Sequence, residues 1–338
     1  MDSVTQVVLG AAVGEACLGK KVGNKAALWG AIGGTIPDLD VAANFFMGQL
    51  DAMVVHRGVS HSIVFSMVMA PIMGWSIYKI YKERQGTQSG WTKLAFWALF
   101  THPLLDCFTT WGTQLFYPFS DYRVAFNSIF VVDPVYTLPF ALCLGIALFL
   151  KRQHRWRSFW NWLGIGLSCF YLLITVINKL TVESIFGNSM HRRGISATRF
   201  STYPLPLNLK WYVVAEEPSG YEIATYHLLK SSPADLQYEF IGKQGKLRDQ
   251  LDGNYVYDRL RWMAKDYYVL RPDSEGLNFH DLRFGIWNFL PGQEPMLGFV
   301  YQLIRTDGEI TDIEQKRPEI DLSKGESWSA FGRFIWEK

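Results

Sequence analysis

The sequence lacks a strong charge of either sign. Its 338 residues include 33 Lys and Arg against 31 Asp and Glu, a formal net charge of +2. Proteins that bind nucleic acid through its phosphates usually present an excess of basic residues. The composition gives no reason to expect a nucleic-acid partner, and we expect none.

Cysteine is also scarce, which disfavours several kinds of site. All four cysteines lie in the apolar first part of the chain, and none has metal-ligand spacing to another: Cys17, Cys107, Cys143 and Cys169. The polar part from His191 onward contains none, so disulfides cannot stabilise it. No catalytic serine or cysteine motif is visible, so covalent catalysis is the less favoured chemistry.

Long hydrophobic runs fill the chain up to about Leu180. With about 20 apolar residues as the length of a membrane-spanning helix, six segments qualify: 3–18, 26–47, 60–81, 91–110, 129–150 and 159–180. The first is the weakest, because it is short, rich in Gly and Ala, and carries Glu15, so it could be a packed internal helix or a re-entrant one. Its small residues would let it pack closely on a neighbouring helix. No basic n-region of a signal peptide precedes it, so we expect it to be retained. The sequence predicts a polytopic membrane domain over residues 1–185, a helical bundle of about six spans.

The pattern changes to alternating apolar and polar residues in the last part of the chain. Segments rich in Tyr, Val, Phe and Ile, bounded by turn residues, are typical of strands: 211–215, 221–229, 236–241, 267–270, 279–289 and 296–304. Residues 255–265 instead have helical spacing. We expect residues 195–338 to form a small extramembrane α+β domain, mainly antiparallel β.

Basic residues orient the predicted bundle. They cluster on alternate loops, as expected for cytoplasmic loops: Lys20, Lys21 and Lys25; Lys79, Lys82 and Arg84; and Lys151, Arg152, Arg155 and Arg157. This places the N-terminus and the C-terminal domain on the outer side of the membrane. His191-Arg192-Arg193, beyond the last segment, argues mildly against this orientation.

Three polar groups lie in or beside the apolar segments: Pro37-Asp38-Leu39-Asp40, His56-Arg57-Gly58-Val59-Ser60-His61-Ser62 and Thr101-His102-Pro103-Leu104-Leu105-Asp106. An ionisable group is costly inside a bilayer and therefore marks a candidate functional site. In the predicted orientation all three groups fall in the same outer layer. The sequence predicts one metal site there, with these candidate ligands: His61, His102, Asp106, Asp38, His56 and Asp40.

Local spacing refines the ligand set. His102 and Asp106 are four residues apart, so they share a helix face and could bind one ion together. Asp38 and Asp40 point to different sides of a regular helix. One of the two is the expected ligand, and the other is expected to cap the helix or support a ligand. Mixed imidazole and carboxylate ligands favour zinc, with manganese or iron as alternatives.

Simpler interpretations apply to several of these residues. A single His in a membrane helix more often hydrogen-bonds a neighbouring helix than binds metal. Asp133-Pro134 is explained by a helix N-cap followed by proline at the first helical position. Asp2 is also most simply a cap. Glu15 is expected to pair with a basic residue away from the site.

The same motifs carry a resemblance to a known family. The opening Met1-Asp2-Ser3-Val4-Thr5-Gln6, the Pro37-Asp38-Leu39-Asp40 element, the paired-histidine motif at 56–62 and His102-Pro103-Leu104-Leu105-Asp106 resemble the YdjM-type family over roughly residues 1–180. Its members are described as metal-dependent hydrolases of the bacterial inner membrane, with a LexA-binding label. Many have a Thr-His pair near the start, where this chain has Thr5-Gln6, so we assign no ligand there.

These observations predict a membrane-embedded, metal-dependent hydrolase acting on a lipid or lipid-linked phosphoester through a metal-activated water. His56 would be a ligand or the general base, and Arg57 would stabilise developing negative charge. The alternative is a non-catalytic membrane protein whose buried polar cluster holds a structural metal and which binds a regulatory partner. LexA is a candidate partner through the family label alone. A transporter is disfavoured because no internal repeat is visible.

Overall fold

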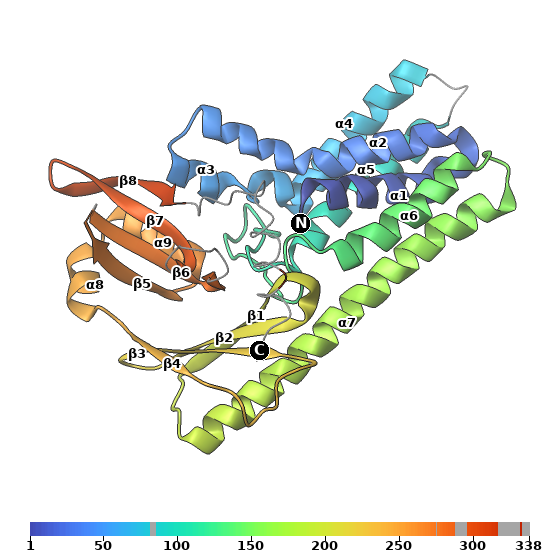
Figure 1. Ribbon diagram of the computed structural model, residues 1–338. Helices are drawn as coiled ribbons and strands as arrows, with labels where there is room; N and C mark the ends of the chain where they lie inside the picture. Colours follow the sequence, from blue (N-terminus) through green and yellow to red (C-terminus); the bar gives the residue numbers. More distant parts are fainter. Residues whose placement is uncertain (82–85, 275, 288–295, 317–331, 333–338) are drawn as a thin grey trace. The chain divides into compact units, whose positions relative to one another are not determined.

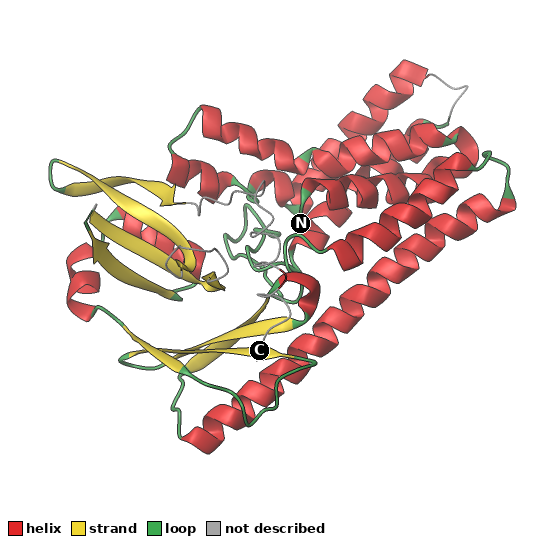
Figure 2. Ribbon diagram, in the orientation of Figure 1, coloured by secondary structure: helices red, strands yellow, loops and turns green. Residues whose placement is uncertain are grey.

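Helices occupy most of the chain up to Arg193, and strands follow from Arg199 onward (Figure 2). The structure is a computed structural model that describes residues 1–81, 86–274, 276–287, 296–316 and 332. The chain forms two compact units (Figure 1). Unit 1 contains Met1–Phe45 and Val55–Val176, and unit 2 contains Phe46–Val54 and Ile177–Lys338.

Unit 1 is helical. Its elements are α1 (Ser3–Val22), α2 (Asn24–Thr35), η1 (Pro37–Phe45), η2 (Val59–His61), α4 (Ile63–Tyr81), α5 (Gln88–Asp106), α6 (Pro134–Phe149) and the first part of α7 (Arg155–Arg193). A loop region from 107 to 133 joins α5 to α6 and contains an isolated bridge between Thr113 and Val124.

Glycine allows α1 and α2 to pack with their backbones in contact. A Cβ added at Gly30 would lie 2.1 Å from the carbonyl oxygen of Gly10, and one at Gly14 would lie 2.2 Å from that of Ala26. Gly23 joins the two helices at a positive φ of 65°, which favours glycine. The small residues of residues 3–18 therefore serve close helix packing, as expected.

Two helix starts follow the caps expected from the sequence. Asp2 accepts a hydrogen bond from the Thr5 backbone N–H at the start of α1. Asp133 caps α6 through the N–H groups of Val135 and Tyr136, with proline at the first helical position. The cap interpretation is confirmed at both positions, and neither carboxylate joins the metal cluster described below.

The predicted fold class is wrong, because about six spans were expected and only two of the described helices are long and apolar enough to cross a membrane. These are α4 and α7, with 28% and 17% of their apolar windows buried. α6 is apolar but shorter. With two candidate spans instead of six, the three polar groups are not assigned to one outer layer of a membrane bundle.

Polar residues and early helix ends explain the difference. α1 carries Glu15, Lys20 and Lys21. α2 ends at Thr35, and the chain continues in the 3-10 conformation of η1 after Pro37. A break of this kind shortens the helix well below about 20 residues.

Unit 2 is built on two four-stranded antiparallel sheets. In spatial order they are β1 (Arg199–Pro204), β2 (Lys210–Glu216), β3 (Gly220–His227) and β4 (Glu239–Gly242), and β5 (Tyr268–Asp273), β6 (Gly276–Trp287), β7 (Met296–Thr306) and β8 (Glu309–Lys316). The remaining elements are α3 (Gln49–Val55), η4 (Pro206–Asn208), α8 (Gly245–Leu251), α9 (Tyr255–Ala264) and the end of α7.

The two sheets share one aromatic and aliphatic core. Tyr212 and Val214 on β2 and Tyr221 on β3 belong to the same buried cluster as Val269 on β5 and Leu297 on β7. Such inward-facing residues alternate along strands that bury one face.

The secondary structure expected for this part is largely observed. Residues 255–265 were expected to be helical, and α9 (Tyr255–Ala264) confirms this, with Val256, Leu260 and Met263 on its buried face. β1 and β8 were not expected. Two other expectations fall partly outside the described residues. These are the end of the strand expected over 279–289, at residues 288–289, and two members of a basic cluster, Lys82 and Arg84.

Candidate metal centre

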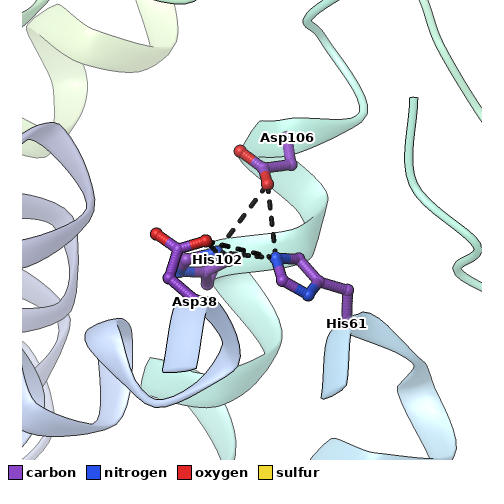
Figure 3. Close-up of side chains that lie close together, drawn as sticks. All are labelled: Asp38, His61, His102 and Asp106. Atoms are coloured by element: carbon purple, nitrogen blue, oxygen red, sulfur yellow. Dashed lines mark hydrogen bonds and ion pairs between the residues drawn. The ribbon is translucent and has the colours of Figure 1, made fainter. Parts of the chain in front are cut away.

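Three segments of unit 1 bring four ionisable side chains together. Asp38 comes from η1, His61 from the end of η2, and His102 and Asp106 from successive turns at the end of α5 (Figure 3). The spacing of four residues places His102 and Asp106 on one face of α5, as expected. These four side chains are the candidate metal ligands, and we call this group of side chains the metal cluster. Each of them offers one ligand atom within 4.8 Å of those of the other three.

The distances within the metal cluster are short and similar. His61 Nε2 lies 3.1 Å from His102 Nε2. Asp38 Oδ1 lies 3.5 Å from His61 Nε2 and 3.3 Å from His102 Nε2. Asp106 Oδ2 lies 3.5 Å from His61 Nε2 and 3.7 Å from His102 Nε2. Two imidazole nitrogens and two carboxylate oxygens therefore surround one small space (Figure 3).

This spacing fits a metal ion. In a tetrahedral site with bonds of about 2.0–2.1 Å, two ligand atoms lie about 3.3–3.4 Å apart. Neighbouring ligands of a six-coordinate ion with bonds of about 2.1 Å lie about 3.0 Å apart. The five distances, from 3.1 to 3.7 Å, extend on both sides of the tetrahedral value. The metal cluster could hold a divalent ion with little movement of its side chains.

Burial and an unsatisfied oxygen support the same fit. The side chains of His61, His102 and Asp106 are fully buried, and that of Asp38 is 19% exposed. Asp106 Oδ2 is buried, and although Arg57 Nε lies 3.1 Å away, no described residue donates a hydrogen bond of normal geometry to it. A buried carboxylate oxygen without a hydrogen bond is costly. A bound cation would reduce that cost, and Asp38 marks the side from which water could reach the site.

Hydrogen bonds to the far ring nitrogens turn both Nε2 atoms toward the space between the four side chains. His102 Nδ1 lies 2.5 Å from the carbonyl oxygen of Gly34, so it must donate there. His61 Nδ1 lies 3.2 Å from Asp40 Oδ2 and 3.0 Å from Ser60 Oγ. A histidine that binds metal through one nitrogen usually donates its other N–H to a carbonyl or carboxylate. Both histidines have this arrangement.

Asp40 organises the paired-histidine loop rather than joining the metal cluster. Its Oδ1 lies 2.7 Å from His56 Nδ1. Its Oδ2 accepts from the backbone N–H of Arg57 at 3.0 Å and from Ser60 Oγ at 2.7 Å. Asp38 thus belongs to the metal cluster, whereas Asp40 and His56 lie outside it. Which of the six residues bind an ion stays a prediction.

Arg57 lies behind Asp106. Its Nε lies 3.1 Å from Asp106 Oδ2, and its Nη1 donates to Thr109 Oγ1 at 2.9 Å. Its backbone φ is 62°, which is in the left-handed region. Residues other than glycine seldom adopt this conformation, and those that do are often found at functional sites. Arg57 therefore offsets the negative charge of the metal cluster, and its role toward a substrate stays a prediction.

The charges of the metal cluster perturb its titration. Burial alone would raise the pKa of Asp106, but the Arg57 guanidinium, the Met1 amino group and His61 hold the pKa well below its usual range. Burial likewise opposes the charge on His61, yet the neighbouring carboxylates of Asp106, Asp38 and Asp40 raise its pKa to about 9. The carboxylates are therefore ionised, as metal ligands must be.

Several partners of the site have no local signal in the sequence. The Gln6 amide donates to Asp106 Oδ1 at 3.0 Å, and the Met1 backbone nitrogen also bonds that oxygen. Gly34 and Thr109 contribute through a carbonyl and a hydroxyl. Only Gln6 had been noted, as a departure from the family motif.

Glu15 does not contribute to the site. It forms a buried ion pair with Arg157, at 2.7 Å between Oε1 and Nε. The expectation that it pairs with a basic residue is confirmed.

The chain matches a known protein family over slightly more than half its length. The family described as YdjM inner membrane protein matches residues 1–182. A relative described as the uncharacterized protein YfhP of Bacillus subtilis (strain 168) is 32% identical over 146 residues, 40% of this chain and 42% of the relative. This chain therefore matches less than half the length of that relative. No solved structure matches.

Proposed function

The chain belongs to the YdjM inner membrane protein family, and on that premise we propose that it is a membrane-bound, metal-dependent hydrolase. The observation that carries the proposal is the set of four donor atoms at metal-ligand spacing. Membrane location follows from the family and agrees with the two apolar helices α4 and α7. Hydrolase chemistry goes beyond these findings and rests on the nature of the donors.

Zinc is the ion we propose first. Two imidazoles and two carboxylates suit zinc, and manganese and iron accept the same donors. The carboxylates of Asp38 and Asp106 would balance the charge of a divalent ion inside a buried site. A bound ion would make a water molecule more acidic and withdraw electron density from a phosphoryl or carbonyl oxygen.

Residues around the metal cluster could move and stabilise charge. His56 is held by Asp40 through Nδ1, which leaves the Nε2 atom of this partly exposed side chain able to take a proton. Arg57 holds a positive charge beside Asp106, where it would stabilise negative charge that develops during the reaction. In this proposal His56 is the general base and Arg57 the electrostatic stabiliser.

A lipid or lipid-linked phosphoester is the substrate that the surroundings favour. Exposed apolar side chains flank the ligands in the sequence, with Leu39, Val41 and Phe45 on η1 and Val59 on η2. Exposed apolar side chains of this kind, close in sequence to polar ligands, suit a substrate with an acyl or isoprenoid tail. A phosphoester is favoured over an acyl ester because Arg57 provides a fixed cation.

Basic residues at the end of α4 and at the start of α7 favour one orientation, although His191, Arg192 and Arg193 at the end of α7 oppose it. Lys79 lies in the last turn of α4, and Arg155 and Arg157 lie in the first turn of α7. If these ends face the cytoplasm, residues 195–338 lie on the periplasmic side. Protease treatment of spheroplasts tests this placement: cleavage within residues 195–338 is expected, and complete protection would reverse it.

The hydrolase proposal is tested first by metal content and then by turnover. Detergent-purified wild type is compared with His61→Ala and His102→Ala, with His191→Ala on the exposed end of α7 as the matched control. We expect about one equivalent of metal in wild type and in the control, and none in the two site variants. The metal-loaded protein is then assayed on phospholipid and lipid-phosphate substrates. A folded wild type that binds no metal, even after reconstitution, would overturn the proposal.

The burial of the metal cluster favours one alternative, a structural ion in a non-catalytic protein. Structural zinc sites are closed by protein ligands, whereas catalytic sites keep an open position. Three of the four ligands are fully buried here. Metal that stabilises the protein but supports no turnover would favour this alternative. A regulatory protein partner, with LexA as the candidate from the family label, would then be sought.

A further inference from the structure

A second polar site lies in unit 1, away from the metal cluster. A cavity of about 500 Å³ is bounded by the end of α1, the connection from α6 to α7 and the start of α7. Its lining includes Glu15 and Lys20 from α1 and Arg152, Arg155, Arg157 and Asn161 from the segment at α7. Two basic clusters that are far apart in the sequence therefore meet at one cavity.

One ion pair in the cavity wall is already complete. Arg157 donates Nε to Glu15 Oε1 and Nη2 to Glu15 Oε2, both at 2.7 Å. It also donates Nη2 to Asn24 Oδ1 at 2.7 Å and Nη1 to the Leu150 carbonyl at 2.8 Å. Both side chains of the pair are 4% exposed. The charges of Glu15 and Arg157 thus neutralise each other, and their hydrogen bonds connect α1 to the start of α7 at the edge of the cavity.

Three other cations have no carboxylate to balance them among the described residues. Within the described part of the chain, Arg152 donates to the Lys21 carbonyl alone, and Arg155 lies over the ring of Trp156. Lys20 forms no hydrogen bond or ion pair with the part of the chain that the structure describes. The cavity consequently has a net positive charge at neutral pH and attracts an anion.

A buried hydrogen-bond acceptor in the cavity wall indicates a second property of the ligand, a hydrogen-bond donor. Asn161 is 2% exposed, and its Nδ2 donates to the Ala12 carbonyl at 3.0 Å. Its Oδ1 is buried and has no hydrogen-bond partner among the described residues. A buried acceptor is normally satisfied by a donor. A hydroxyl group on a ligand would supply that donor, which the ionised oxygens of a phosphodiester could not, because they only accept.

We propose that this cavity binds a phosphate ester that carries a free hydroxyl, with the headgroup of an anionic phospholipid as the favoured source. Lys20, Arg152 and Arg155 would contact the phosphate oxygens, and Asn161 Oδ1 would accept from the hydroxyl. Arginine and lysine are the usual phosphate partners in proteins.

Exposed aromatic side chains beside the cavity favour the lipid over a soluble ester. Trp156, Phe159 and Trp162 are exposed at the start of α7, one of the two helices apolar enough to cross a membrane. Tryptophan is enriched where a spanning helix meets the headgroup region. Basic pockets between helices at that level bind anionic headgroups. A cavity next to Trp162 would therefore open where headgroups are concentrated.

The test measures lipid binding to the full-length protein in detergent. Native mass spectrometry titrates phosphatidylglycerol, whose headgroup has free hydroxyls, against zwitterionic phosphatidylcholine. We expect at least tenfold tighter binding of phosphatidylglycerol to wild type. The double variant Lys20→Gln/Arg152→Gln should weaken this binding about thirtyfold, since each cation near a membrane surface contributes roughly fivefold. Both side chains are exposed, so the variant is expected to fold.

Controls separate a specific cavity from general charge. Lys79→Gln removes an exposed cation on α4 that does not line the cavity, and it should leave phosphatidylglycerol affinity unchanged. Glycerol 1-phosphate is added as a soluble competitor. Competition at a concentration similar to that of the lipid would support the cavity and identify a soluble ester as its ligand. Equal lipid affinity in the double variant and in Lys79→Gln, or no preference over phosphatidylcholine in wild type, would overturn the proposal.

Discussion

Replacing Asp40 by asparagine tests how the metal cluster is supported. The Asp40 carboxylate lies within hydrogen-bonding distance of His56 Nδ1, the Arg57 N–H, the Ser60 hydroxyl and His61 Nδ1, at distances from 2.7 to 3.2 Å. Asp40→Asn keeps the shape of the side chain, but it removes the charge and turns an NH₂ group toward some of these donors. The orientation of the His61 ring depends on this carboxylate.

The expected loss is moderate and specific. Mutation of a group that orients a metal-binding histidine typically weakens metal affinity about tenfold to hundredfold. This corresponds to roughly 1.4–2.7 kcal/mol of binding free energy. Because Asp40 lies outside the four clustered residues, the number of bound ions should not change. Loss of charge-assisted hydrogen bonds should also lower thermal stability.

Competition with a chelating zinc indicator at fixed pH measures this affinity on the detergent-purified full chain. Asp121→Asn, an exposed acid-to-amide change on the loop after α5, is the matched control and should bind zinc as wild type does. His61→Ala should lose the ion altogether. An Asp40→Asn protein with wild-type affinity would refute the supporting role. Complete loss of binding would instead make Asp40 a ligand.

Three further outcomes are expected. Because the pKa of His61 is raised to about 9, metal must displace a proton below that pH. Apparent affinity, measured by the same competition, should therefore rise about tenfold per pH unit up to about pH 9, and a flat profile would contradict this. Gly30→Ala should lower the thermal midpoint, at a cost of about 1–3 kcal/mol, because its Cβ would meet an α1 carbonyl at 2.1 Å. Gly166→Ala, with open space, should be neutral or stabilising. Glu15→Gln should cost about 3–5 kcal/mol of unfolding free energy, because Arg157 is left buried without its partner; equal melting of Glu15→Gln and Asp121→Asn would contradict this.

The sequence by itself determined features that depend on interactions between residues close together in the chain. The cap at Asp133, the small residues that let α1 meet α2, and the buried face of α9 all follow from neighbours a few residues apart. Alternating residues likewise predicted most strands of unit 2. The candidate ligands were recognisable because histidine and aspartate are costly in apolar segments.

Long-range features required the tertiary structure. Hydropathy counted residues 26–47 as one span, but α2 ends at Thr35 and η1 follows, a break that apolar content does not reveal. Spacing could not choose between Asp38 and Asp40; only the approach of His61 and His102 places Asp38 within the metal cluster. Gln6 reaches Asp106 across 100 residues of sequence. Such contacts depend on how helices from distant segments pack, and neither composition nor periodicity carries that information.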